Sequence, residues 1–369
     1  MDFDIVAIGA GIAGATAAAH LSPHRRVALI EAEESAGYHT TGRSAALWVL
    51  NYGPPDVRTL TGLSRGFFEN PPKGFTATPL MRRRAVLLVA TEAQLPDLDE
   101  AIRDGMGLRR VMPEEAAAML PAIRPGAIAA GAVEDDAFDM DVAAIHQGFL
   151  RQLRENGGIL ALRHRAGKIG RRDGVWHVET TTGEILRAPV LVNAAGAWGD
   201  EVAALAGAQP LGLVPKRRTA AIIDPAPHDP ENWPMILDVE EQWYARPEAR
   251  TRLMVSPADA TPSHPHDVRP EEFDVALGID RMQQILDIAV RRVEHQWAGL
   301  RTFSPDGSLA FGWDARVEGF FWCVGQGGYG IQTSPAAGRL VSDIVLGHDP
   351  GAAAAIADII DPKRFQQLA

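Results

Sequence analysis

The chain opens on Phe3-Asp4-Ile5-Val6-Ala7-Ile8-Gly9-Ala10-Gly11-Ile12-Ala13-Gly14, an apolar run of strand length that ends in a G-x-G-x-x-G motif. An alanine-rich helical pattern follows up to residue 21, Ser22-Pro23 breaks it, and a second apolar strand over 26–30 ends at Glu31. A glycine motif that follows a strand and opens a helix in a βαβ unit predicts dinucleotide binding. The alternative is a glycine-rich tight turn that packs the core of a βαβ unit without a ligand.

The three glycines and the acidic residue have separate expected roles. Gly9 lets the chain turn tightly, Gly11 lets the backbone approach a pyrophosphate, and Gly14 lets the helix lie against the strand. The helix N-terminus offers unpaired N–H groups and a partial positive charge to the phosphates. Glu31 lies 22 residues after Gly9, which suits a carboxylate that accepts from ribose hydroxyls and argues against a 2′-phosphate.

Length and composition limit the class of protein. A chain of 369 residues suggests about two domains, and a hydrophobic fraction of 46% is ample for their cores. The net charge of −11 argues against a nucleic-acid surface. The single cysteine, Cys323, excludes a disulfide framework. The histidines within 261–270 have a spacing that suits no common metal site, so no metal is predicted.

The start of the chain and its apolar runs bear on location. A strand begins almost at Met1, which leaves no room for a secretory signal. No apolar run reaches the roughly 18 residues of a membrane span. We therefore expect a cytoplasmic protein without a transmembrane segment, and we leave peripheral attachment to a membrane open.

A second cofactor loop is expected soon after Glu31. The stretch Gly37-Tyr38-His39-Thr40-Thr41-Gly42-Arg43-Ser44-Ala45-Ala46 has two glycines, three aliphatic hydroxyls and one arginine. Because this loop follows directly on the βαβ unit, we interpret it as a second phosphate-binding loop, with its backbone N–H groups and hydroxyls as donors. An ordinary surface loop is the alternative.

The expected nucleotide-binding fold is split along the chain. It gathers an amphipathic helix over 141–156, a strand over 190–193 that runs into Ala194-Ala195-Gly196, and a strand over 320–324 that runs into a glycine-rich turn. The segments between carry short strands interrupted by prolines and a long helix predicted over 270–294. The predicted fold class is α/β, or α+β overall. It has a Rossmann-like FAD-binding domain over 1–50, 140–210 and 297–369, and a mostly antiparallel β-sheet domain for substrate over 51–139 and 211–296.

Glycine turns near the two ends of the chain favour FAD over NAD as the cofactor. One βαβ unit with a short clamp would suffice for NAD, whereas a second strand-to-helix glycine turn over 325–333 suits the isoalloxazine end of FAD. A helix N-terminus at this turn would stabilise negative charge on the reduced flavin.

Five segments, in order along the chain, carry a resemblance to a known family. They are YHTTGRSAA at 38–46, NAAGAW at 193–198, PKRR at 215–218, WAGLR at 297–301 and QGGYGIQT at 326–333. With them the chain resembles the glycine-oxidase and D-amino-acid-oxidase group of flavoproteins over nearly its whole length, and most closely the D-arginine dehydrogenases. The resemblance implies non-covalent FAD and two domains. It also implies that D-amino acids are deaminated by hydride transfer from Cα to flavin N5, giving 2-oxo acids and ammonia.

The resemblance also assigns roles by position. Arg218 and Arg301 would bind the substrate α-carboxylate, for which the rigid fork of arginine is suited. The expected catalytic residues are Tyr52, Arg218, Tyr244, Arg301, Gly328 and Gln332, where the tyrosines donate hydroxyls and the Gly328 carbonyl accepts from the α-amine. The residues expected at FAD are Gly9, Gly11, Ile12, Ala13, Gly14, Glu31, Ala32, Thr40, Thr41, Gly42, Arg43, Ser44, Ala45, Ala46, Leu47, Ala166, Ala195, Gly196, Trp198, Gly327, Gly328, Tyr329, Gly330, Ile331 and Gln332.

Each of these assignments has a plainer alternative. Arg218 could belong to a solvated basic run with Lys216 and Arg217. Arg301 could pair with a structural carboxylate, because an unpaired charge in the middle of a strand is costly. The two tyrosines could be aromatics at the edge of a core. The directions of these side chains in the folded protein distinguish the alternatives.

The substrate pocket departs from the family pattern at three positions. Val86 stands where the D-arginine dehydrogenases carry the carboxylate that receives the substrate guanidinium, and Leu47 and Val49 replace a histidine and a threonine. A cationic head against aliphatic side chains would lose its hydration without gaining a partner. We therefore expect apolar D-amino acids to be preferred over D-Arg and D-Lys.

Three other functions stay open: a D-arginine dehydrogenase proper, a glycine- or sarcosine-type secondary-amine oxidase, and a non-catalytic nucleotide-binding protein. The last would leave the paired arginines and tyrosines without a shared task. The expected partners are a small D-amino acid and an electron acceptor. The sequence does not separate quinone, dye and oxygen as acceptors, so oxidase and dehydrogenase are both open.

Overall fold

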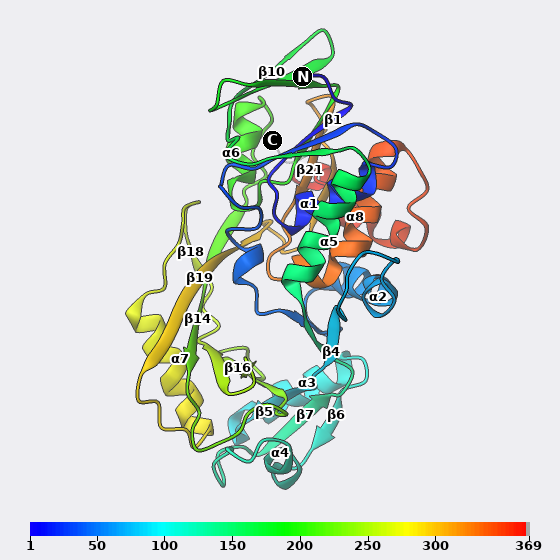
Figure 1. Cartoon of the computed structure of the whole chain (residues 1–369). Coiled ribbons are helices and arrows are strands. Elements are labelled where there is room, and N and C mark those ends of the chain that lie inside the picture. Colours follow the sequence, from blue (N-terminus) through cyan, green and yellow to red (C-terminus); the bar gives the residue numbers. More distant parts are fainter. Residues whose placement is uncertain (367–369) are drawn as a thin grey trace.

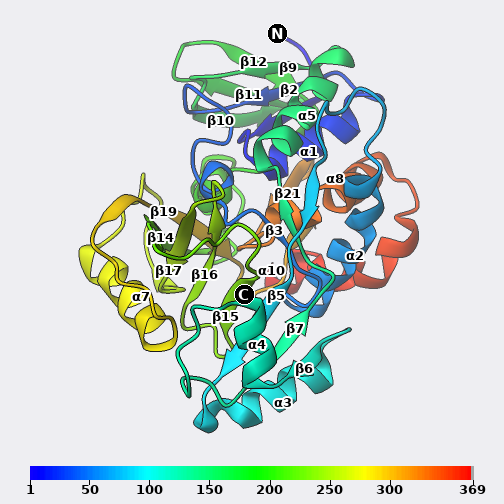
Figure 2. The same ribbon diagram turned by 60° about the horizontal axis from the view of Figure 1, so that its bottom comes forward.

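The computed structural model describes residues 1–366 and builds them around two large sheets (Figures 1 and 2). In the six-stranded sheet, β1 lies between β2 and β13, and every pair is parallel except β20 with β21. In spatial order its strands are β20 (Ala310–Trp313), β21 (Phe320–Val324), β13 (Val190–Asn193), β1 (Ile5–Ile8), β2 (Val27–Ile30) and β9 (Ile159–Ala161).

Both faces of this sheet are covered by other elements. Successive side chains of a strand point to opposite faces, so neighbouring residues pack in different cores. Ala7 and Leu29 pack in one core with α1 (Ile12–Leu21), α5 (Val142–Glu155) and α8 (Gly330–Leu346). Val6 and Ala28 pack on the other face in a core with a three-stranded sheet and α6. These elements are β10 (Ala166–Arg172), β11 (Val175–Thr180), β12 (Ile185–Ala188) and α6 (Gly199–Leu205), which follows the 3-10 turn η3 (Gly196–Trp198).

The nine-stranded sheet is antiparallel except for β5 and β15, which pair in parallel. Helices α4 (Pro113–Met119) and α7 (Glu272–Ile285) pack with Leu87 and Val89 on one of its faces. Helix α3 (Leu95–Asp104) packs at the edge of the opposite face, through Leu98. The strands run β18 (Thr261–Pro262), β14 (Val214–Ile223), β17 (Arg252–Ser256), β16 (Tyr244–Glu248), β15 (Met235–Asp238), β5 (Val86–Ala90), β7 (Ala130–Glu134) and β6 (Arg109–Val111), with β19 (Val293–Phe303) pairing β14.

Smaller elements connect the two large sheets. A three-stranded sheet holds β3 (Leu47–Trp48), β8 (Phe138–Met140) and β4 (Met81–Arg83), and α2 (Pro55–Glu69) packs on α8. The other short elements are η1 (Thr41–Arg43), η2 (Glu92–Gln94), η4 (Gly351–Ile356), α9 (Ala357–Ile360) and α10 (Lys363–Gln366). Among residues 1–366, no helix combines the length and the apolar character needed to cross a bilayer.

The predicted fold class is confirmed, but one predicted helix is too long. The helix expected over 270–294 ends at Ile285, and β19 begins at Val293, because the chain from there pairs with β14. This pairing also places β19 in the nine-stranded sheet, although most of it was expected in the cofactor-binding domain. Helix α2, which was expected in the substrate domain, packs in the core of the six-stranded sheet. The division into two domains stays a prediction.

Candidate functional site

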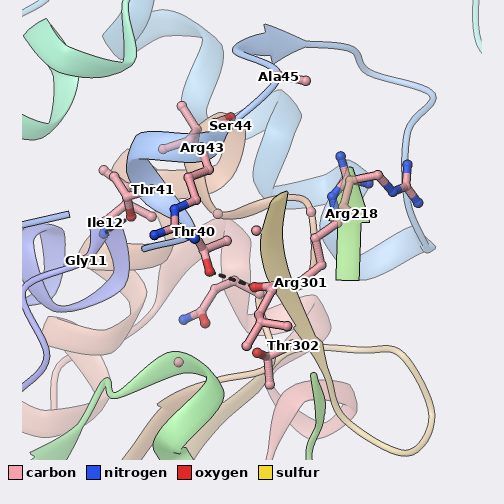
Figure 3. Close-up of a pocket in the computed structure, with 18 of the residues that line it drawn as sticks. Gly11, Ile12, Thr40, Thr41, Arg43, Ser44, Ala45, Arg218, Arg301 and Thr302 are labelled. Carbon is pink, nitrogen blue, oxygen red and sulfur yellow. Dashed lines mark hydrogen bonds between the residues drawn. The ribbon is translucent and has the colours of Figure 1, made fainter. Parts of the chain in front are cut away.

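One cavity of about 680 Å³ lies where the two large sheets meet, a volume typical of cofactor and ligand sites. Its lining begins at the carboxyl ends of β1, β2 and β13, where open α/β sheets bind ligands. It continues over the glycine turn before α8 and onto β14 and β19. Figure 3 shows part of this lining, with residues from the start of α1, from the loop over 37–46 and from β14 and β19.

The glycine turn after β1 has the geometry that its sequence predicted. Gly9 has φ +100°, and a Cβ on it would lie 2.5 Å from the Ala194 carbonyl oxygen, so only glycine fits. Gly14 does not line the cavity. A Cβ there would lie 1.9 Å from the Gly9 oxygen, so Gly14 allows α1 to pack against the turn from behind.

Glu31 lies at the end of β2, on the wall of the same cavity. Its carboxylate accepts hydrogen bonds from the backbone N–H groups of Ala10 at 2.8 Å and Glu33 at 3.0 Å. These bonds fix the carboxylate against the glycine turn. Each carboxylate oxygen has a further lone pair, so ribose hydroxyls could donate to the same group.

The loop over 37–46 joins the glycine turn to β19 (Figure 3). The Thr41 hydroxyl accepts from the N–H of Ile12 at 2.9 Å, at the N-terminus of α1, and Thr40 donates to the Leu300 carbonyl at 2.6 Å. Arg43 donates to the Ala298 carbonyl at 2.9 Å and pairs with Asp267. The guanidinium of Arg43 thus holds the loop in place, and the loop is part of the cavity wall.

Most residues expected at the cofactor lie on the cavity wall. The exceptions are Gly14, Gly42 and Tyr329. A Cβ on Gly42 would lie 2.8 Å from the Gly37 oxygen, so this glycine allows the loop to close on itself. The Tyr329 ring packs edge-on against Tyr52, with centroids 5.0 Å apart. The cradle formed by Gly9, the start of α1 and Glu31 fits the pyrophosphate and ribose of FAD.

Arg218 and Arg301 lie on paired strands and point to the same face. Arg218 of β14 is opposite Gly299 of β19, and Arg301 is opposite Lys216. Because side chains alternate along a strand, residues two apart share a face, and so do directly opposed residues. The two guanidinium groups therefore reach the same cavity, as Figure 3 shows.

Both arginines have neutral partners. Arg301 donates to the Tyr52 hydroxyl at 2.9 Å, and Arg218 donates to the Asp259 carbonyl at 2.7 Å. Within the described chain, neither has a carboxylate within 4 Å, whereas the neighbouring Arg217 pairs with Glu271 and Asp274. The structural carboxylate that could have explained Arg301 is thus absent from residues 1–366.

The expected tyrosines and Gly328 surround these arginines. Tyr244 is 5% exposed, and its ring centroid lies 6.0 Å from the Arg218 guanidinium. Burial alone would raise the pKa of Tyr244, but the charges of Arg301 and Arg218 and the hydrogen bonds to the hydroxyl outweigh it, so the pKa lies below its usual value. A Cβ on Gly328 would lie 3.0 Å from the Tyr52 hydroxyl and 3.1 Å from Arg301.

Gln332 lies on the wall, but its side chain is engaged with the protein. It donates to the Thr61 hydroxyl at 2.9 Å and to the Tyr52 carbonyl at 3.4 Å, and it accepts from the N–H of Val49 at 3.3 Å. The amide therefore ties α8 to the segment that precedes α2. Its expected catalytic role stays a prediction.

The cavity beyond the arginines is mostly apolar. Leu47, Val49 and Val86 lie there, in one cluster with Tyr244. Sequence analysis missed the other side chains of this cluster on the wall, and only the register of the sheet brings them together. They are Leu88, Ala220, Met235, Leu237, Met254, Ala258 and Trp297. Glu134 and Glu241 are among several acidic residues on the wall that were also missed.

A dinucleotide cradle and two arginines without a carboxylate partner in the described chain line the same cavity, and this arrangement is that of a dinucleotide-binding protein. The family model described as FAD dependent oxidoreductase (DAO) matches residues 4–344, and the chain belongs to this family. Its cofactor is therefore FAD.

Individual relatives agree with the family. The chain is 26% identical to glycine oxidase of Pseudomonas aeruginosa over an alignment of 388 positions. The alignment covers 98% of this chain and 97% of that protein. It is 25% identical to mitochondrial dimethylglycine dehydrogenase of Homo sapiens, covering 69% of this chain and 31% of that protein. The chain spans about a third of the length of the first curated relatives it matches. The crystal structure of glycine oxidase from Geobacillus kaustophilus has the same fold, with a TM-score of 0.83 at 21% identity over 94% of this chain and 95% of that chain.

Proposed function

We propose that this protein oxidises D-amino acids with apolar side chains to imines, which water hydrolyses to 2-oxo acids and ammonia. The observation that carries the proposal is the pair Arg218 and Arg301. Their guanidinium groups face the cofactor cavity, and no carboxylate of the described chain lies within 4 Å of either. Burying such groups without a counter-ion is costly, so a substrate carboxylate is the natural partner.

The residues around the pair would hold the substrate in one orientation. The α-carboxylate would lie between Arg218 and Arg301, with the hydroxyls of Tyr52 and Tyr244 donating to it, and the Gly328 carbonyl would accept from the α-amine. Bound non-covalently, FAD supplies the acceptor for the hydride that leaves Cα. Positioning of this kind contributes up to about 7–11 kcal/mol in ideal cases.

The apolar preference follows from the wall beyond the arginines. Val86 is 2% exposed and packs with Met235, Tyr244 and Met254. An aliphatic or aromatic substrate side chain would gain by displacing water from this wall. A guanidinium or ammonium head would lose its hydration there. The D configuration rests on the resemblance of the catalytic residues to their family positions.

The holoenzyme tests this proposal directly. The yellow protein should lose its flavin absorbance when a D-amino acid is added without oxygen. We expect kcat/KM for D-Leu, D-Met and D-Phe to exceed that for D-Arg at least about tenfold, equivalent to about 1.4 kcal/mol. D-Arg as the best substrate would indicate a D-arginine dehydrogenase. Bleaching by L- but not D-amino acids would contradict the proposed configuration.

A charge placed at Val86 should move the preference. We expect Val86→Glu to raise the ratio of kcat/KM for D-Arg over D-Leu at least about tenfold, because a carboxylate would then pair with the guanidinium. Val86→Leu is the matched control and should leave the order of substrates unchanged. An unchanged ratio in Val86→Glu would mean that the substrate side chain does not reach this position.

A glycine- or sarcosine-type amine oxidase is the second candidate function. It is favoured by the 26% identity to Pseudomonas aeruginosa glycine oxidase over nearly the full length of both chains. The same anaerobic measurement with glycine and sarcosine separates the two. Faster bleaching by sarcosine than by any D-amino acid would favour the second candidate.

A further inference from the structure

Glu134 is a buried carboxylate on the wall of the cavity that sequence analysis did not identify. It ends β7, directly opposite Val86 of β5, and is 3% exposed. One carboxylate oxygen accepts from the N–H of Leu50 at 2.8 Å, and the other accepts from the side-chain amide of Asn51 at 2.9 Å. Both oxygens therefore hold the chain segment over 49–52.

This segment has no helix or strand to fix it. Residues 49–52 follow β3 and precede α2, and a weak turn bond from the N–H of Tyr52 to the Val49 carbonyl, at 3.3 Å, is internal to it. Asn51 also exchanges hydrogen bonds with the backbone of Met106, at 2.7 and 2.9 Å. Gln332 holds the two ends of the segment from α8. Its conformation thus depends on side chains that come from other elements.

The segment carries Tyr52, which accepts a hydrogen bond from Arg301 beside Gly328. A small displacement of 49–52 would move this hydroxyl away from the arginine. Burial raises the pKa of the Glu134 carboxyl, while the hydrogen bonds from Asn51 and Leu50 favour its ionised form. A buried carboxylate is costly unless its oxygens are hydrogen-bonded, and the Glu134 oxygens obtain these bonds from the 49–52 segment.

We propose that Glu134 is a positioning residue that acts through Tyr52: it fixes the 49–52 segment so that the Tyr52 hydroxyl stays against Arg301. Only the assignment of a substrate to Tyr52 rests on the proposed function. The alternative is that Glu134 binds a cationic substrate side chain in place of the carboxylate missing at Val86. Glu134 is only 3% exposed, so little of its carboxylate is open to a substrate, which argues against that alternative.

Hydrogen exchange of the holoenzyme tests the first half of the proposal without any substrate. In Glu134→Ala, amides of the 49–52 segment should exchange at least about tenfold faster, as expected for losing a hydrogen bond to a charged group. Glu134→Gln keeps one acceptor oxygen and should show a smaller increase. Exposed Glu115, which pairs with Arg109 on the surface, gives the control Glu115→Gln, with no change in this segment. Unchanged exchange in both Glu134 variants would overturn the proposal.

A double-mutant cycle tests whether the effect passes through Tyr52. For D-Leu, Glu134→Ala and Tyr52→Phe should each raise KM, with FAD content unchanged. The KM of the double variant should be no more than about twofold above that of the single variant with the higher KM. If the two single increases in KM instead multiply in the double variant, Glu134 acts independently of Tyr52. A loss confined to D-Arg and D-Lys would show that it binds the substrate side chain. Either result would overturn the proposal.

The two experiments keep this proposal separate from the proposed function. A wild-type enzyme that oxidises no D-amino acid would refute the proposed function, and the exchange measurement alone would then decide whether Glu134 holds the segment. An active enzyme with unchanged exchange in Glu134→Ala would refute the role of Glu134 and leave the function intact.

Discussion

At the scale of single residues, Arg217 and Arg218 are neighbours in the chain with different surroundings. Arg217 is held by Glu271 and Asp274, whereas Arg218 meets the Asp259 carbonyl and the ring of Tyr244. The difference comes from the alternation of β14, which sends successive side chains to opposite faces. A basic run in the sequence thus becomes one structural arginine and one that faces the cavity.

Replacing Arg301 tests the guanidinium fork. Lysine keeps the charge but cannot bind a carboxylate through two parallel hydrogen bonds. We expect Arg301→Lys to lower kcat/KM for D-Leu by about ten- to a hundredfold, corresponding to roughly 1.5–3 kcal/mol for a hydrogen bond to a charged group. FAD content should not change. Exposed Arg83 gives the control Arg83→Lys, for which wild-type kinetics are expected. Full activity in Arg301→Lys would contradict its role.

Tyr244 predicts a feature of the pH profile. Its hydroxyl donates only while protonated, and its pKa lies below the usual value of about 10 because Arg301 and Arg218 outweigh burial. As pH rises, the donor is therefore lost earlier than for a free phenol, and kcat/KM should fall on the alkaline side below about pH 10. In Tyr244→Phe this fall should vanish or move to higher pH. The same alkaline fall in both proteins would assign it to another group.

At the scale of elements, the turn between β1 and α1 depends on close backbone contact. A Cβ on Gly14 would come within 1.9 Å of the Gly9 oxygen, so neither side can yield without moving the helix or the turn. The same helix start receives Thr41 of the loop over 37–46. A shift of α1 would therefore disturb both parts of the cofactor cradle at once.

Gly14→Ala should lose FAD. We expect the purified variant to contain much less than one FAD per chain by absorbance, with a lower Tm, because the added methyl separates α1 from the turn. Gly170→Ala on β10 is the control, since a Cβ there meets nothing within 4 Å and the residue has no positive φ. Normal FAD content in Gly14→Ala would contradict the packing described for this turn.

At the scale of the whole molecule, one cavity is lined by both large sheets. Its wall runs from Ile8 at the end of β1 to Gln332 in α8, and it includes Arg218 and Tyr244 of the nine-stranded sheet. A cofactor bound there contacts elements that are far apart in the sequence. Its binding free energy should therefore stabilise the folded chain as a whole.

FAD should raise the Tm of the protein in proportion to the logarithm of its free concentration. A ligand that binds only the folded state adds about 2.7 kcal/mol at one hundred times its Kd. We expect the deflavinated protein to melt lower and to recover when FAD is restored, as followed by circular dichroism. NAD at the same concentration is the control and should have little effect. A Tm independent of FAD would contradict this linkage.

Much of the fold could be predicted because its signals are local. The glycine turn, both flanking strands and the cofactor loop lie within 46 residues, and each of them contributes residues to the cavity wall. The helix expected over 270–294 was too long for the opposite reason: pairing of β19 with β14, about 80 residues away, overrides the local pattern after Ile285. Pairing partners at that distance leave no trace in local periodicity.

The sequence by itself determined the cofactor half of this protein, because a strand, a glycine turn and a helix are set by contacts between near neighbours in the chain. It also supplied Arg218 and Arg301, through resemblance. Only the tertiary structure decided that the two arginines share a face, that no carboxylate of the described chain lies within 4 Å of either, and that Glu134 holds the segment with Tyr52. These facts depend on strand register, and register is fixed by packing between distant segments rather than by any one of them.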